Sequence, residues 1–506
     1  MNVMTGAFPL LTILAVLPLA VSALILMIPA LRVQGRPIAL VTSLAELLGF
    51  IWIAATFDYS HAADFQWAET YQWIPAFGTS WALGVNGLSL VMLLLASALL
   101  PIVLVAEWAL DSEAEGGRYA ALLLFLQFFI VVIFAARDVF VFYLAFEAML
   151  LPLYLLIGQF GRTEKRGKAA LKFVIYSLVG GLIMLVGIIW IPITQGWKPD
   201  SFLMENLMMN GIDAGSPTAT MLVFLSFFIA FAIKAPMVPL HTWLADVAEA
   251  ARPGTSTILV GVLDKIGTYG MIMISLRIFP TETLVAAPWI AGFAILSILY
   301  GALAALGSKN LLRLISFTSV SHFGFMVMAI FIGSAYALTG AMVYMVAHGV
   351  TIAGLFLLSG ALIRRGGTAT IKEYGGLQRV TPVLAGTFLM TGLASVALPG
   401  LSGFVPEYMI LLGTYQVAPW AAGVSVISVV IAAVYILLPY QHIFTGPPEK
   451  AKQISDLNTL ERTAITPLLV AMVVLGVWAA PLVNTVSQVA DSTLIVTIHH
   501  LEGSAK

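Results

Sequence analysis

Long apolar segments dominate the sequence, and they constrain the fold more than any other feature. A helix needs about 20 apolar residues to cross a membrane, whereas a membrane barrel would show alternating apolar and polar residues. We therefore predict an all-α polytopic membrane protein. Its fourteen expected transmembrane helices cover residues 9–30, 38–57, 83–106, 119–136, 138–159, 171–194, 219–244, 255–278, 285–306, 312–333, 335–363, 382–413, 417–444 and 464–489.

The composition agrees with a membrane protein and excludes other classes. Of the 506 residues, 60% are hydrophobic and 10% are charged, against about 25% charged in ordinary soluble domains. The net charge of −1 offers no broad basic surface, so we expect membrane lipid and no nucleic acid as a partner. Without any cysteine, the chain has no disulfide, Cys-ligated zinc or ordinary Fe–S cluster.

The distribution of positive charge predicts the orientation. Most of the 24 lysine and arginine residues fall in every second connection, beginning with Arg32 and Arg36 after the first segment. Cytoplasmic loops carry such an excess, so we predict that both termini lie outside, on the periplasmic side. The opposite connections hold only Arg137, Lys198, Arg277 and Lys506.

Six ionisable residues lie deep within six different apolar segments. A charge at that depth costs at least about 2.5–3.5 kcal/mol. Each residue by itself could join two helices by a structural hydrogen bond, as we expect for Glu46 in the second segment. Together, acids, amines and imidazoles in one membrane predict a proton relay. The six are Glu147, Lys234, Lys265, His322, His348 and Glu407.

Helix breakers accompany two of these charges. Residues 234–241 read KAPMVPLH and residues 398–407 read LPGLSGFVPE. Proline removes a backbone donor, and a broken membrane helix with a charge at the break is typical of an ion site in repeat-built transporters. The breaks are in the seventh and twelfth segments, so we predict two inverted five-helix repeats, segments 4–8 and 9–13. The expected units are 1–118 (three helices), 119–278 and 285–444 (one proton half-channel each), and 445–506 (last helix and tail).

Six stretches resemble the antiporter-like membrane subunits of respiratory complex I. They are residues 140–158 (FVFYLAFEAMLLPLYLLIG), 234–244 (KAPMVPLHTWL), 261–270 (GVLDKIGTYG), 319–322 (SVSH), 347–349 (AHG) and 398–404 (LPGLSGF). The M-type (subunit-4-like) chain of that family has glutamate on the broken twelfth helix, where its L- and N-type sisters and the cation/proton antiporter chains have lysine. Glu407, and the end of the chain soon after the last segment, are therefore similar to the M-type.

The resemblance implies a function and partners. The chain would be a proton-translocating subunit of NADH:quinone oxidoreductase in a bacterial plasma membrane, next to the L- and N-type subunits. It would have no cofactor of its own, with NADH, FMN, Fe–S clusters and quinone in partner subunits. By position, Glu147 and Lys234 resemble the ion pair of the first half-channel and Lys265 the central relay lysine. His322 and His348 resemble bridging histidines, and Glu407 the terminal carboxylate of the second half-channel.

Other functional classes are also compatible with the sequence, and several positions depart from the family pattern. The chain could instead serve a multisubunit cation/proton antiporter or a related membrane-bound hydrogenase or formate-oxidising complex. A solute symporter or a scaffold fits the buried charges less well. Residues 241–248 read HTWLADVA where the family commonly has HTWLPDAH, and Asn86 replaces a frequent aspartate. Asp264 stands where an apolar residue is usual, and the roles of Asp264, Glu46 and His442 are undetermined.

Overall fold

The computed structural model describes residues 3–6, 8–109, 112–196, 200–212, 214–447 and 454–504. Within these residues, thirteen helices are long and apolar enough to cross a membrane. The helical fold class is thereby confirmed. The spans are α1 (Leu10–Met27), α3 (Gly35–Thr56), α4 (Gly87–Ala106), α5 (Glu113–Ala135), the pair α6 (Val139–Ala148) and α7 (Leu150–Phe160), α8 (Arg166–Gln195), α10 (Pro217–Lys234), the run α12–α14 (Pro253–Ile278), α15 (Pro280–Leu306), α16 (Leu311–Phe331), α17 (Ala335–Gly366), α20 (Pro419–Phe444) and α21 (Thr459–Val477).

Both predicted helix breaks are present. In the seventh segment, α10 ends at Lys234 and α11 (Thr242–Ala250) follows after the two prolines. The twelfth segment consists of two short helices, α18 (Pro382–Ser395) and α19 (Phe404–Val417). Gly400 between them has a φ of 88°, a left-handed conformation that glycine adopts without steric cost. The two inverted repeats, and the division into units at 119 and 285, stay predictions.

The predicted fourteenth span is wrong at its C-terminal limit. Helix α21 ends at Val477, and a separate helix, α22, runs from Ala480 to Ser504. The apolar run to residue 489 continues across this break, so hydropathy gave no sign of it. Helix α22 packs on α17, and the buried Arg277 donates to Thr493 Oγ1 at 2.9 Å, which ties α22 to the end of α14.

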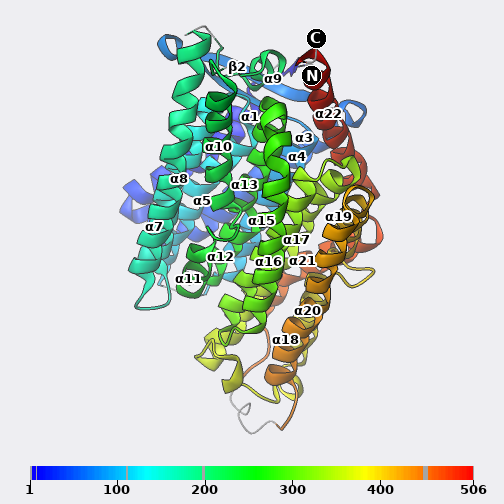
Figure 1. Cartoon of the computed structure of the whole chain (residues 1–506). Coiled ribbons are helices and arrows are strands. Elements are labelled where there is room, and N and C mark those ends of the chain that lie inside the picture. Colours follow the sequence, from blue (N-terminus) through cyan, green and yellow to red (C-terminus); the bar gives the residue numbers. More distant parts are fainter. Residues whose placement is uncertain are drawn as a thin grey trace.

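A small sheet was not expected from the sequence. The aromatic connection after α3 forms β2 (Phe65–Ile74) and β3 (Thr79–Val85), which pair antiparallel, and β1 (Val3–Thr5) pairs parallel to β2. The sheet, α9 (Met204–Asn210) and both chain ends lie at one end of the bundle, while α18 and α20 reach the opposite end (Figure 1). Lys198 and Lys506 lie outside the described residues.

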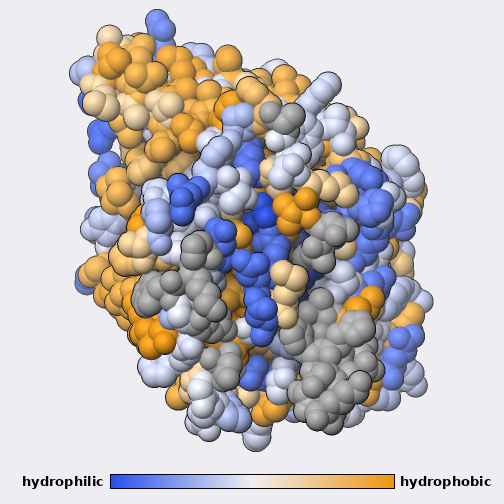
Figure 2. All heavy atoms as spheres, turned by 90° about the horizontal axis from the view of Figure 1, so that it is seen from above, coloured by the Kyte–Doolittle hydropathy of each residue, from blue (hydrophilic) through white to orange (hydrophobic). Residues whose placement is uncertain are grey.

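The helices form a bundle with a fully buried centre and an apolar rim. Every residue from Pro253 to Pro280 is buried, and nearly all of α16 and α17 is buried as well. By contrast α1, α8 and α20 present large exposed apolar side chains, as a lipid-facing surface requires. Seen from the end that carries the termini, hydrophilic side chains gather in a central band, with hydrophobic ones along the upper rim (Figure 2).

Candidate functional site

The two helix breaks place opposite charges at helix ends that favour them. Lys234 is the last residue of α10, and Glu407 lies in the first turn of α19. The C-terminal end of a helix carries partial negative charge and the N-terminal end partial positive charge. Each side chain is therefore stabilised in its charged form by the helix that bears it. Both are buried, with 2% of Lys234 and 6% of Glu407 exposed.

Lys234 and Glu147 form no direct ion pair in the described structure, and the functional pairing that the resemblance implied stays a prediction. The Lys234 ammonium donates to Ser177 Oγ on α8 at 3.3 Å and lies 5.1 Å from the centre of the Phe146 ring. The Glu147 carboxylate lies against Gly181 on α8, and neither of its oxygens has a hydrogen-bond partner among the described residues. Ser177 and Gly181 are one turn apart, so the two charged groups lie against the same face of α8.

Lys265 lies at the centre of the bundle, between two π-helical stretches, Leu259–Leu263 and Met271–Ser275. Its ammonium donates to the Val260 carbonyl and lies 2.7 Å from His348 Nδ1 on α17. None of the Lys265 surface is exposed. π-helical turns in membrane and soluble helices alike are frequent at functional positions. This lysine–imidazole contact joins two helices that are far apart in the sequence.

The two histidines are adjacent, as their predicted role requires. The rings of His322 on α16 and His348 are 5.3 Å apart, centre to centre. His322 Nδ1 and His348 Nε2 have no hydrogen-bond partner among the described residues. The ring of Tyr344, one turn before His348 on α17, lies 5.6 Å from that of His322, and its buried hydroxyl also has no partner there.

Tyr344 is a candidate that sequence reasoning missed. The Glu407 carboxyl acts electrostatically on the hydroxyls of Tyr344 and of Tyr435 on α20. Gly340, one turn before Tyr344, packs on Met409 and Ile410 of α19, so Tyr344 lies on the side of α17 that faces the helix of Glu407. Its position four residues before His348, on the same helix face, was the available signal, but one tyrosine among 15 did not stand out.

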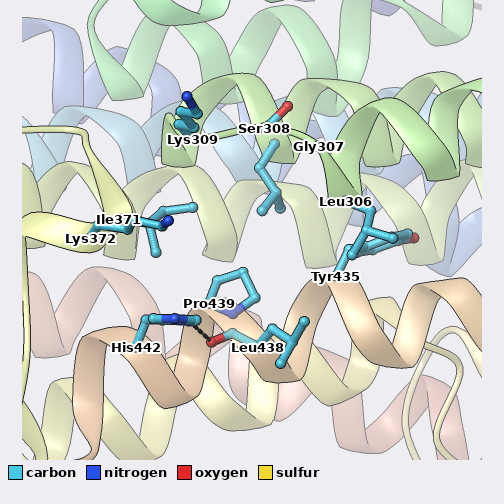
Figure 3. A pocket seen from close by; sticks show the side chains of 11 residues that line it. Leu306, Gly307, Ser308, Lys309, Ile371, Lys372, Tyr435, Leu438, Pro439 and His442 are labelled. Atoms are coloured by element: carbon cyan, nitrogen blue, oxygen red, sulfur yellow. Dashed lines mark hydrogen bonds between the residues drawn. The ribbon is translucent and has the colours of Figure 1, made fainter.

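Tyr435 is one of the residues that line a cavity of about 260 Å³. Tyr435 lies at one end of the cavity, and the exposed Lys309, Lys372 and His442 lie toward the other (Figure 3). His442 is exposed and its Nδ1 is 2.8 Å from the Leu438 carbonyl oxygen. His442 thus lies at the surface, unlike the buried Lys265. Glu46, which we expected to be structural, is fully buried and accepts from Gln127 Nε2 at 2.9 Å.

Ion pairs join the first half of the chain, at α8 and α11, to the second half, at α16. They lie outside the row of buried ionisable residues that extends from Glu147 through Lys265 to Glu407. Asp246 on α11 binds Lys172 of α8 at 2.6 Å and Arg313 of α16 at 2.7 Å, and Arg313 also binds Glu249 at 3.0 Å. Partial burial of Asp246 raises its pKa, but the hydrogen bonds from Lys172 and Arg313 outweigh this and lower the pKa below its ordinary value of 3.8. The four side chains line a cavity of about 540 Å³.

Known proteins match this chain over most of its length. Residues 136–432 match the family described as NADH:quinone oxidoreductase/Mrp antiporter, transmembrane. The chain belongs to this family. A relative from Mycobacterium tuberculosis, named NADH-quinone oxidoreductase subunit M, is 38% identical over 97% of this chain and 95% of its own length. The M-type resemblance is thereby confirmed.

Two solved structures share the fold. A chain of respiratory complex I from Thermus thermophilus matches with a TM-score of 0.86 and 29% identity, over 96% of this chain and 99% of that one. A chain of the Mrp complex from a Dietzia species matches with a TM-score of 0.84 over 97% and 99% of the two chains. At 20% identity, the latter shows the common fold alone.

Proposed function

We propose that this chain is the M-type, proton-translocating membrane subunit of an NADH:quinone oxidoreductase. The family match, the subunit M relative and the complex I structure support this assignment. NADH oxidation and quinone reduction, with FMN and Fe–S clusters, take place in partner subunits, and the neighbouring membrane subunits include the L- and N-type chains. The membrane is bacterial, and the chain crosses it with both termini on the periplasmic side.

The contact between Lys265 and His348 is the observation that carries the proton-transfer role. An ammonium and an imidazole 2.7 Å apart transfer a proton when the imidazole accepts and the amine releases it. On one side of this contact lie Lys234 and Glu147, and on the other lie His322, Tyr344 and Glu407. These residues form a row through the helix bundle, and protons pass along it from one residue to the next. Water molecules bridge those neighbours that no direct hydrogen bond connects.

The test is proton uptake by proteoliposomes that contain the intact complex, driven by NADH and quinone. We expect Glu147→Gln and Lys234→Ala to lower the protons moved per NADH oxidised, while the exposed-lysine control Lys309→Ala does not affect assembly of the complex. Full pumping in both Glu147→Gln and Lys234→Ala would contradict the relay.

A cation/proton antiporter is the second candidate, because the matched family includes antiporter chains. Purification of the native complex separates the two candidates. We expect NADH-oxidising and quinone-reducing subunits to copurify. A complex that lacks them and exchanges cations for protons would favour the antiporter.

A further inference from the structure

Asp264 is a buried carboxylate that the relay described above does not use. Only 1% of it is exposed, and neither carboxylate oxygen has a hydrogen-bond partner among the described residues. Native proteins rarely leave a buried polar group unpartnered, and an acidic side chain in the middle of a membrane is rarer still.

Asp264 and Lys265 are adjacent in sequence but face different helices. Successive helical positions point about 100° apart. Lys265 reaches His348 on α17. Gly267, one turn after Asp264, packs on the end of α10, because a Cβ added there would lie 2.8 Å from the Cβ of Ala235. Residues three apart share a helix face, so the face of Asp264 meets the end of α10, next to Lys234.

The electrostatic contacts agree with this placement. The charge of Asp264 acts on both Lys234 and Lys265. No hydrogen bond within the described part of the chain joins the two lysines to each other. Lys234 is bonded to Ser177, and Lys265 to Val260 and His348. Asp264 is thus a buried acid on the face that meets the end of α10, where Lys234 lies, and it is next to Lys265 in the chain.

We propose that Asp264 transfers protons between Lys234 and Lys265, an inference that rests on the proposed relay. The Lys234 ammonium gives a proton to the Asp264 carboxylate, which breaks an N–H bond, forms an O–H bond and leaves a neutral amine. The resulting carboxylic acid then gives the proton to the neutral amine of Lys265. A bridging water completes either step. Charge and atoms balance without any oxidant or reductant.

The test compares three replacements in the intact, reconstituted complex. Asp264→Asn removes titration and keeps the size, Asp264→Glu keeps titration, and Asp264→Leu supplies a larger apolar side chain with the same branching. We expect the Asn and Leu variants to assemble, because a neutral group is easier to bury than a carboxylate, and to move protons about 100-fold more slowly. The Glu variant should recover much of the activity with an altered pH profile of pumping. If Asp264→Asn does not assemble, Asp264→Leu provides the same comparison of pumping with the native chain.

Two controls make the outcomes distinct. Glu46→Gln removes another buried carboxylate, outside the row, and should pump normally. Lys234→Ala tests the relay itself. Loss of pumping in Lys234→Ala together with full pumping in both Asp264→Asn and Asp264→Leu would overturn only the role of Asp264. Full pumping in Lys234→Ala would overturn the relay on which the inference rests.

Discussion

Replacement of Glu407 measures how much the charge at the start of α19 matters for pumping. The carboxylate lies in the first helical turn, with 6% of the residue exposed. A charge at a helix end is worth about 0.3–1 kcal/mol, and up to about 2 kcal/mol when it is partly buried. Glu407→Lys loses a favourable interaction and gains an unfavourable one. The combined change is about 1–2 kcal/mol, which corresponds to roughly 5- to 30-fold in rate.

Glu407→Gln should have the larger effect. Glutamine keeps the shape of the side chain but neither accepts nor releases a proton, and the loss of an acid–base group costs about 100-fold or more in rate. Lysine still titrates, so Glu407→Lys should pump at a level between those of the native chain and Glu407→Gln. Both variants should assemble, because the only change in the fold lies at a helix end.

The assay is proton uptake by proteoliposomes per NADH oxidised, after equal assembly of the complex has been verified. Glu46→Gln is the matched control, because it makes the same change at a buried carboxylate outside the row and retains an acceptor for Gln127. If Glu407→Gln pumps as well as the native chain, Glu407 only caps a broken helix and the end of the row is wrongly assigned.

Three further predictions follow from individual contacts. His322→Ala and His348→Ala should each lower pumping less than loss of the central lysine does, and the double change should exceed the sum of the two; strict additivity would show that they do not share a path. Tyr344→Phe removes a hydroxyl without a partner among the described residues, so the complex should assemble normally and pump more slowly. As a control, Tyr119→Phe removes a hydroxyl that is hydrogen-bonded to a threonine at 3.1 Å. It should cost about 0.5–1.5 kcal/mol of stability and leave pumping normal. Asp246→Asn should lower thermal stability at neutral pH and not in strong acid, because the ion pairs of Asp246 stabilise the fold above the ordinary pKa of 3.8 and are lost as the pH falls through the lower pKa of the folded state.

The sequence by itself determined the fold class and which ionisable residues lie within membrane-spanning segments. Apolar segments of about 20 residues have few alternatives to membrane helices, and the proline and glycine residues beside Lys234 and Glu407 mark both breaks. The same local information failed where continuity of hydropathy hid an interruption, as at Val477, and where a polar, aromatic connection formed β2 and β3. Both depend on contacts with distant segments.

Only the tertiary structure decided which deep charges meet. Sequence showed Glu147 and Lys234 as an acid and a base on two segments, but the fold leaves them without a direct ion pair and places Ser177 next to the lysine. It also brings Lys265 to His348, 83 residues away in the chain. A pairing of this kind depends on how α13 and α17 pack, which no local pattern encodes.

The structure also gave meaning to residues that sequence could not interpret. Asp264 was an unexplained acid beside a lysine until the packing of α13 on α10 placed its helix face near the end that bears Lys234. Tyr344 was one tyrosine among many until the packing of α17 on α19 placed it on the side that faces the helix of Glu407. The membrane makes each buried ionisable group costly, so the sequence alone shows which positions need an explanation. Helix packing decides which of these groups lie close together, because the distances between side chains of different helices depend on it.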